Sequence, residues 1–305
     1  MEQEKILTNF LNIHWIRPEV AIWRTLDVLH MKKIQFKKPI IDLGCGDGTF
    51  SFTNFGGSLD YSFDVFKTMK NTSGFFQGKD IHDQKFSGDF KITRKPKVRI
   101  DVGLDWKNNL LEKAQKLSLY DKTIKHNLNS ILPVSDNSFE TVFSNVFYWI
   151  KNIKQLLRES KRILSDSGQI ILLVPDKNLK KNLIYSQYIK YGYQWAKILD
   201  RGIYQNITNH CNTFTQWKKL FSEEDLKIET HESYLSNNFI KLWSIGLRPF
   251  SPYIIEMANK LQPKDRLNIK KRWIDETVPL LNSFLDYELS NKEAKCFHIF
   301  SLKKK

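Results

Sequence analysis

The chain has 305 residues, of which 41% are hydrophobic, so it is long enough and apolar enough to bury a sizeable core. This composition excludes a disordered or fibrous protein. The sequence contains no uninterrupted run of about 18 apolar residues, so no membrane span is expected. Three widely spaced cysteines exclude a disulfide framework and a paired zinc signature. We therefore expect a soluble, cytoplasmic protein with no bound metal and no membrane partner.

The net charge of +15 raises the question of nucleic-acid binding, because clustered cations release counterions when they meet phosphate. Of the 48 basic residues only 10 are Arg, however, and Arg is the usual choice for bidentate contacts to phosphates and bases. The basic run 91–97 and the tail 303–305 therefore read as solubilising surface. Nucleic acid is a partner that we consider but do not favour.

Short apolar runs alternate with amphipathic helical patterns over residues 38–174, as expected for a parallel sheet covered by helices on both faces. Helices are expected in the segment that precedes this sheet. The five strands expected first are residues 40–43, 98–104, 123–126, 139–144 and 169–175. The helices expected between them are residues 108–117 and 153–164, the second ending at a turn over 165–168.

Two further strands are expected at residues 226–231 and 296–301, with a mostly helical stretch between them that is too long for a simple connection. The predicted fold is a Rossmann-like, doubly wound α/β fold with a mostly parallel seven-stranded sheet. We expect four parts, namely an N-terminal helical segment (1–37), a core (38–234) with an insertion at about 51–97, a helical insertion or cap (235–292), and the last strand with the basic tail (293–305).

A glycine-rich turn follows the first strand, in the run Asp42-Leu43-Gly44-Cys45-Gly46-Asp47-Gly48. Glycines permit such a turn and remove the Cβ atoms that would keep a ligand from the backbone. The spacing is G-x-G-x-G, with Thr49 where a dinucleotide fingerprint has its last glycine. Asp42 and Asp47 would repel a phosphate but suit a ligand that carries an ammonium and a sulfonium.

Further motifs follow the turn in a fixed order: Gly103-Leu104-Asp105 after the second confident strand, residues 132–142 leading into the fourth, and residues 156–168 before the fifth. With these pieces the sequence resembles the class I S-adenosylmethionine-dependent methyltransferases, in the branch similar to small-molecule methyltransferases, over about residues 39–175. The resemblance implies a methyltransferase with S-adenosylmethionine as cofactor. It also implies that Asp42, Gly44, Cys45 and Gly46 form the cofactor-binding turn.

Members of that family carry an acidic residue at the end of the second strand, which accepts hydrogen bonds from the ribose hydroxyls. Asp105 is our candidate, because it stands between a strand-like and a helix-like segment. Asp64 is the alternative, since its distance from Asp42 is closer to the family norm, although its surroundings read as a loop. Choosing Asp105 requires an insertion of roughly 40 residues after Phe50, counted along the sequence between the two motifs.

The remaining cofactor contacts are also implied by the resemblance. Asn127 stands where the family usually has the Asp that accepts a hydrogen bond from adenine, and its carbonyl oxygen can accept the same bond. Leu128 would pack against the adenine ring. Trp106, beside Asp105, and Asn145, after the fourth strand, complete the predicted cofactor site.

Two residues are candidates for the catalytic step. His210 lies in the polar cluster 206–217 and could be a general base or orient the acceptor, because histidine titrates near neutral pH. The alternative is a loop histidine near the start of a helix. Tyr148 follows the fourth strand, where the family presents residues to the acceptor, or it is simply part of the core. Glu140 sits before that strand and reads as structural.

The acceptor is not named by any motif. We expect methyl transfer to O, N or C of a small molecule or carbohydrate, supported by the helical insertion, which could enclose a modest pocket. Two alternatives are an RNA methyltransferase and a non-catalytic partner protein that keeps the fold. The sequence 145–148 lacks the prolines of the motif that is used on base amino groups, and an intact glycine turn argues against a degenerate copy.

Overall fold

The computed structural model describes residues 2–67, 90–200, 203, 207–247, 250–293 and 295–305. Seven strands form one sheet in the order β5-β4-β1-β6-β7-β9-β8, in which the first five are parallel and β9 runs antiparallel to both neighbours. Their bounds are β1 Ile40–Leu43, β4 Ile100–Asp105, β5 Tyr120–Lys125, β6 Phe139–Ser144, β7 Leu164–Pro175, β8 Leu226–Ser236 and β9 Lys295–Lys304. The predicted Rossmann-like, mostly parallel seven-stranded fold is confirmed.

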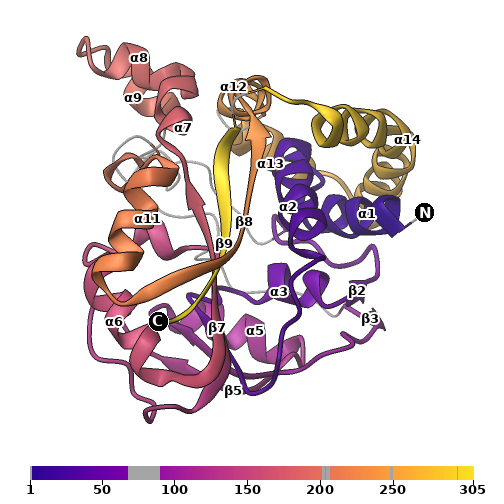
Figure 1. Cartoon of the computed structure of the whole chain (residues 1–305). Coiled ribbons are helices and arrows are strands. Elements are labelled where there is room, and N and C mark those ends of the chain that lie inside the picture. The colour runs from indigo at the N-terminus through magenta and orange to yellow at the C-terminus, as the bar shows by residue number, and fades with distance from the viewer. Residues whose placement is uncertain (1, 68–89, 201–202, 204–206, 248–249, 294) are drawn as a thin grey trace.

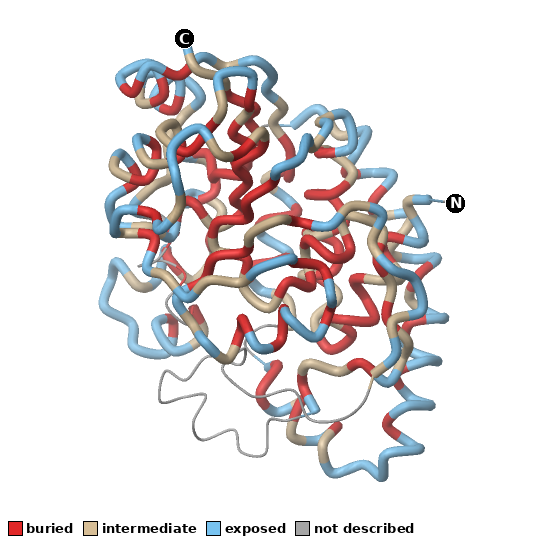
Figure 2. Tube along the Cα trace, turned by 90° about the horizontal axis from the view of Figure 1, so that it is seen from below, coloured by how far each residue is buried: buried red, intermediate tan, exposed pale blue. Residues whose placement is uncertain are grey.

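Helices cover both faces of the sheet (Figure 1), and each face has its own apolar core. On one face, α6 (Ile153–Ile163) and α11 (Phe214–Glu223) pack residues such as Leu157 and Trp217 against the strands. On the other face lie α2 (Pro18–Met31), α3 (Thr49–Asn54) and α5 (Asn108–Lys116). Figure 2 shows buried residues running through the middle of the molecule between these layers.

The N-terminal helix and the helices between β8 and β9 lie side by side, although they are far apart in sequence. They are α1 (Glu2–His14), α12 (Asn237–Ile245), α13 (Ser251–Asn259) and α14 (Pro263–Ser290). Gln3 Nε2 on α1 donates to Asn282 Oδ1 on α14 at 3.0 Å. Among the described residues no helix combines the length and apolarity that crossing a membrane would require.

The region predicted as an insertion contains α3 and a small antiparallel pair, β2 (Ser58–Leu59) with β3 (Ile92–Arg94). Residues 68–89 of it lie outside the described part of the chain. The remaining short elements are η2 (Phe147–Trp149), α7 (Lys177–Asn182), α8 (Ile184–Ile189), α9 (Gln194–Asp200) and η3 (Thr208–His210).

The turn predicted at residues 165–168 is a bulge within β7, which begins at Leu164 directly after α6, since Phe139 pairs with Leu164 but Thr141 pairs with Gln169. The polar side chains there find partners across the sheet instead of closing a turn. The hydroxyls of Ser165 and Ser167 donate to the Glu140 carboxylate at 2.6 and 3.0 Å. Glu140 therefore fastens the start of β7 to β6, which is the structural role expected for it. The third predicted strand begins at Tyr120, three residues earlier than expected.

A buried ion pair joins α14 to the region after β2. Arg266 Nη2 lies 2.8 Å from Asp64 Oδ2, and both side chains are nearly sealed from solvent, at 6% and 5% exposure. Trp15 Nε1, just beyond α1, also donates to Asp64 at 3.2 Å. Lys270, one turn further along α14, donates to the carbonyl oxygens of Tyr61 and Phe63. Asp64 thus holds three distant segments together.

We predict that Asp64→Ala lowers the free energy of unfolding by about 3–5 kcal/mol, because it leaves the Arg266 guanidinium buried without its counterion. Urea denaturation of the purified variant measures the change. The matched control is Glu276→Ala on the same helix, which removes an exposed ion pair with Arg272 and should change stability by less than about 0.5 kcal/mol. Equal effects of the two substitutions would contradict the assignment.

Candidate active site

The turn after β1 is fixed by contacts with β4 and with the segment that follows β6. The backbone N–H groups of Gly44 and Cys45 both donate to the carbonyl oxygen of Leu104, at 2.8 and 2.9 Å. Gly44 has φ +80°, and a Cβ added there would lie 2.2 Å from Val146 Cγ2. No other residue fits this position, since the side chain would collide and the backbone would be strained. The turn is therefore held at the carboxyl edge of the sheet.

Gly46 is the open point of the turn. Its φ is +58°, and a Cβ added there would meet no atom within 4 Å. Its N–H donates to Asp105 Oδ2 at 3.1 Å, so the carboxylate at the end of β4 lies directly beside the turn. The structure thus brings Asp105 to the glycine turn. It places Asp64 in the buried ion pair with Arg266 instead.

Each carboxylate oxygen of Asp105 accepts a hydrogen bond from a different backbone N–H group. Its Oδ1 accepts from the backbone N–H of Lys107 at 2.9 Å while Oδ2 accepts from Gly46. Burial raises the pKa of its carboxyl group, although these backbone donors oppose the rise. Trp106, the next residue, is 65% exposed and so presents its indole at the same edge.

Asp42 lies behind the turn. Its Oδ2 accepts from Ser51 Oγ at 2.6 Å and from the hydroxyl of Tyr120 at 2.8 Å, and the residue is buried. Burial raises the pKa of Asp42 to about 6, partly offset by these two donors. Its Oδ1 is buried and has no hydrogen-bond partner among the described residues. Asp42 therefore packs behind the turn, with Oδ2 hydrogen-bonded and Oδ1 without a hydrogen-bond partner among the described residues.

The turn carries a negative potential. The pKa of the Cys45 thiol is raised well above its usual range, first by burial and then by the charges of Asp42, Asp105 and Asp47. The same field that disfavours a thiolate favours a cation nearby. An open backbone at Gly46, an unused buried carboxylate oxygen and this potential all fit a ligand with an ammonium and a sulfonium, and they do not fit a phosphate.

The predicted adenine contacts lie on the loop after β5. Leu128 is buried near the turn, with Cδ1 3.6 Å from a Cβ placed on Gly44. Asn127 is exposed, and its Oδ1 accepts from both the backbone and the side-chain nitrogen of Asn129 at 3.0 Å. The Asn127 oxygen predicted to accept a hydrogen bond from adenine thus already accepts two hydrogen bonds from Asn129. Asn145 lies at the end of β6 and is buried.

The two predicted catalytic residues lie on neighbouring segments past the ends of β6 and β7. The ring of His210 hydrogen-bonds with the backbone of Ile150, just after η2, and partial burial lowers the pKa of His210. Tyr148 is buried against Phe297, with ring centroids 5.5 Å apart. Burial raises the pKa of Tyr148 to about 12, so its hydroxyl stays protonated at neutral pH and is no general base.

Sequence reasoning missed the polar contacts that join α2 to β8 near the carboxyl end of β7. Tyr234 on β8 donates its hydroxyl to Asp27 Oδ1 at 2.6 Å, and Arg24 Nη1 on α2 donates to Asp27 Oδ2 at 2.9 Å. Asp27 is buried within α2, and Trp23 of the same helix packs edge-on against Phe297 at 5.3 Å. The sequence did offer one signal for these contacts, since Asp27 is a carboxylate among apolar residues of an expected helix. Its partner Tyr234 could not be predicted, because it lies 207 residues further along the chain.

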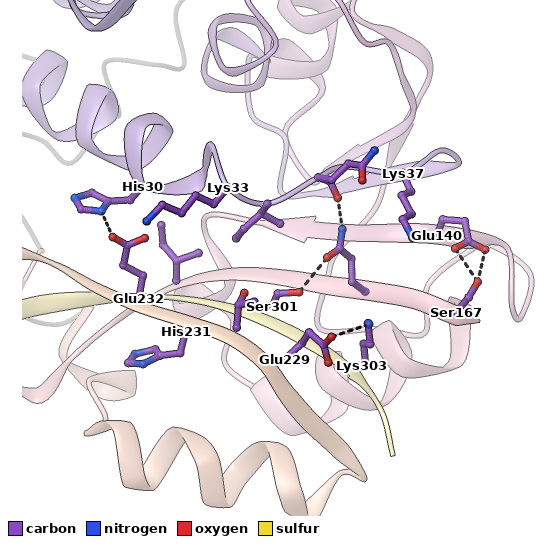
Figure 3. Close-up of a pocket in the computed structure, with 15 residues that line it drawn as sticks. His30, Lys33, Lys37, Glu140, Ser167, Glu229, His231, Glu232, Ser301 and Lys303 are labelled. Atoms are coloured by element: carbon purple, nitrogen blue, oxygen red, sulfur yellow. Dashed lines mark hydrogen bonds and ion pairs between the residues drawn. The ribbon is translucent and has the colours of Figure 1, made fainter.

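A hollow of about 410 Å³ lies at the opposite edge of the sheet, near the amino ends of β6 and β7 (Figure 3). It is lined by charged side chains of both signs, among them Lys33, Lys37 and Glu140. Two of its acids are already paired, Glu232 with His30 at 2.7 Å and Glu229 with Lys303 at 3.0 Å. None of the predicted site residues lines it, so this hollow is separate from the glycine turn.

Residues 95–172 match the family model described as a methyltransferase domain. That match spans β4, β5, β6, α6 and most of β7, which are the elements that flank the glycine turn. Over these residues the chain is similar to methyltransferase domains, in agreement with the predicted class I S-adenosylmethionine-dependent methyltransferase. The predictions of enzyme class and of S-adenosylmethionine as cofactor are confirmed.

Solved structures of methyltransferases resemble this one only distantly. A S-adenosylmethionine-dependent methyltransferase of Thermotoga maritima is 11% identical, with a TM-score of 0.47 and coverage of 94% of this chain and 91% of that one. A geranyl diphosphate C-methyltransferase of Streptomyces coelicolor, solved with Mg²⁺, geranyl diphosphate and S-adenosyl-L-homocysteine, is 8% identical, with a TM-score of 0.44 and coverage of 95% and 84%. Likeness at this level says nothing about the acceptor.

One curated protein, the tyrosine–tRNA ligase of Wigglesworthia glossinidia brevipalpis, is 22% identical over 302 residues. The alignment covers 95% of this chain, which spans 63% of the length of that protein. Identity this low transfers no activity to the methyltransferase.

We predict that the stability difference between the native methyltransferase and its Asp42→Asn variant changes with pH. A raised folded-state pKa means that the Asp42 carboxyl stabilises the fold when protonated, below about pH 4, and that this contribution is lost as pH rises through about 6. The native chain should lose about 3 kcal/mol relative to Asp42→Asn across this window. Urea denaturation at a series of pH values measures it, and a pH-independent difference would contradict the burial of the Asp42 carboxyl.

Proposed function

We propose that this methyltransferase acts on a small-molecule or carbohydrate acceptor bound at the carboxyl ends of β6 and β7. The observation that carries the proposal is the cover over this edge. Trp23 of α2 packs against Phe297 of β9, and the buried Arg24–Asp27–Tyr234 contacts fasten α2 to β8. An edge covered by α2 favours a compact acceptor over a base inside a folded RNA.

The cofactor would be held at the glycine turn. We assign the ribose hydroxyls to Asp105, since its carboxylate lies beside Gly46, and adenine packing to Leu128, with Trp106, Asn127 and Asn145 beside it. Gly44, Cys45 and Gly46 would offer the backbone of the turn. Asp42 would stabilise that turn and its cationic ligand through its charge. When bound, S-adenosylmethionine supplies a methyl group on a sulfonium that is already activated for in-line displacement.

We assign His210 to the acceptor. Its ring is fixed by the backbone of Ile150, and its lowered pKa keeps the imidazole neutral at neutral pH, which is the form that accepts a proton. For a hydroxyl acceptor, His210 would take the O–H proton as the oxygen attacks the methyl carbon. Tyr148, protonated and buried close by, would position the acceptor by a hydrogen bond.

Calorimetric titration with S-adenosylmethionine and with its demethylated product tests the cofactor site. Asp105→Ala should weaken binding at least roughly tenfold, because it removes charged hydrogen bonds to the ribose. Asp64→Asn, checked for folding by circular dichroism, should leave the affinity unchanged. Loss of binding in Asp64→Asn with retention in Asp105→Ala would show that the ribose residue is misassigned, and no binding to the native chain would overturn the cofactor site.

Formation of S-adenosylhomocysteine with a panel of glycosides, phenols and total RNA tests the acceptor class. We expect turnover with a glycoside or phenol and none with RNA. Turnover with RNA alone would contradict the proposal and favour an RNA methyltransferase.

With a hydroxyl acceptor from that panel, kcat/KM of the native chain should fall as pH falls through the pKa of His210. His210→Gln should lower kcat/KM by about 10²–10⁴ and remove this acid limb, because the base is gone. A rise in KM with an unchanged pH profile would instead mean that His210 only orients the acceptor.

A further inference from the structure

Helices α8 and α9 form a hairpin that stands out from the body of the methyltransferase (Figure 1). Gly192, with φ +83°, lies in the connection between the two helices. The hairpin follows α7, which itself begins right after β7 ends at Pro175. It therefore projects from the edge of the sheet at which the acceptor is proposed to bind.

Large apolar side chains gather on the surface of this hairpin. The rings of Tyr188, Tyr193 and Trp195 lie within 5.0–6.4 Å of one another, and all three residues are exposed. Tyr191, 70% exposed, and Ile198, 58% exposed, belong to the same hairpin. We call these five residues the aromatic knob. A concentration of exposed apolar side chains on a projecting element marks a binding surface.

The exposed charges of residues 177–199 are all of one sign, since the flanking Asp176 and Asp200 are buried. Residues 177–199 contain five lysines and no Asp or Glu. The five, each exposed, are Lys177, Lys180, Lys181, Lys190 and Lys197. Lys190 Nζ lies over the Tyr191 ring, 5.0 Å from its centroid, so aromatic and cationic groups share one surface. Such a surface complements an anionic partner.

The chemistry of these side chains favours a lipid bilayer over nucleic acid. Tyr and Trp prefer the interface between water and lipid, where their rings are buried and their polar atoms stay hydrated. Lys extends its charge to lipid headgroups while its methylenes lie along apolar surface. Exposed aliphatic groups do not stack on bases, yet Ile198 is one, and α12 adds exposed Leu242 and Ile245 next to α8. Ser244 Oγ of α12 accepts from Ile184 N of α8 at 3.0 Å.

We propose that the aromatic knob and its lysines dock the methyltransferase on the surface of an anionic lipid bilayer. Aromatic rings would enter the headgroup region, and the lysines would lie against acidic headgroups. This stands against the expectation from sequence that the chain has no membrane partner. The proposal goes beyond the acceptor assignment and does not depend on it, since docking is measured without methyl transfer.

Co-sedimentation of the full chain with vesicles tests this docking. One set contains phosphatidylcholine alone and the other phosphatidylcholine mixed with phosphatidylglycerol. We expect binding to the mixed vesicles that falls with added salt, and little binding to the neutral ones. Tyr191→Ser/Trp195→Ser should weaken binding at least roughly tenfold. Lys190→Gln/Lys197→Gln should weaken it roughly thirtyfold, because each lysine near an acidic surface contributes about a factor of five.

The matched control is Leu280→Ser/Tyr287→Ser on α14, which removes two equally exposed apolar side chains, at 70% and 51%, away from the knob. It should bind the mixed vesicles like the native chain, and circular dichroism should show every variant folded. Absence of native binding, equal binding to neutral vesicles, or equal loss in the control would each overturn the proposal. Knob-dependent binding of a fluorescein-labelled single-stranded RNA without vesicle binding would overturn it in favour of a nucleic-acid surface.

Discussion

The close approach of the Gly44 backbone to Val146 is the constraint on which the functional edge depends. A Cβ at Gly44 would lie 2.2 Å from Val146 Cγ2, so the chain can pass between β4 and the segment after β6 only as glycine. Passing there, it places two backbone donors on the Leu104 carbonyl and the Gly46 N–H on Asp105. The turn, the end of β4 and the end of β6 are thereby fixed as one unit, and a ligand at the turn meets all three.

This unit concentrates the negative charge of Asp42, Asp47 and Asp105, of which Lys107 offsets part at Asp105. Within the described part of the chain Asp42 accepts only from the hydroxyls of Ser51 and Tyr120, and burial raises its pKa to about 6 despite these two donors. The buried Asp64 and Asp27, by contrast, each have an arginine within 3 Å. These two carboxylates are thus each paired with a cation inside the chain. Among the described residues Asp42 has no such pair, and its raised pKa lowers the stability of the fold near neutral pH.

Positive charge is gathered elsewhere on the molecule. Residues 177–199 carry five lysines and no acid beside the exposed rings of the aromatic knob, whereas the edge with the glycine turn carries Asp42, Asp47 and Asp105. The net charge of +15 thus includes a local excess of acidic groups at the turn, of which Asp42 and Asp105 are buried. The two regions are separated by α2, whose buried contacts with β8 and β9 cover the edge of the sheet. Helices α7–α9 project beyond this edge (Figure 1).

The sequence by itself determined the parallel core, the glycine turn and the methyltransferase class, because strand periodicity and turn glycines are local properties that a short window contains. It also predicted Asp105 beside that turn, where the structure has it, on the strength of the strand before it. Only the tertiary structure decided that Asp64 is bound to Arg266, that Asp42 rests on Tyr120, and that residues 165–168 extend β7 toward Glu140. Each of these depends on a partner that is distant in sequence, and pairing over such distances is set by how the helices and strands pack rather than by any local pattern.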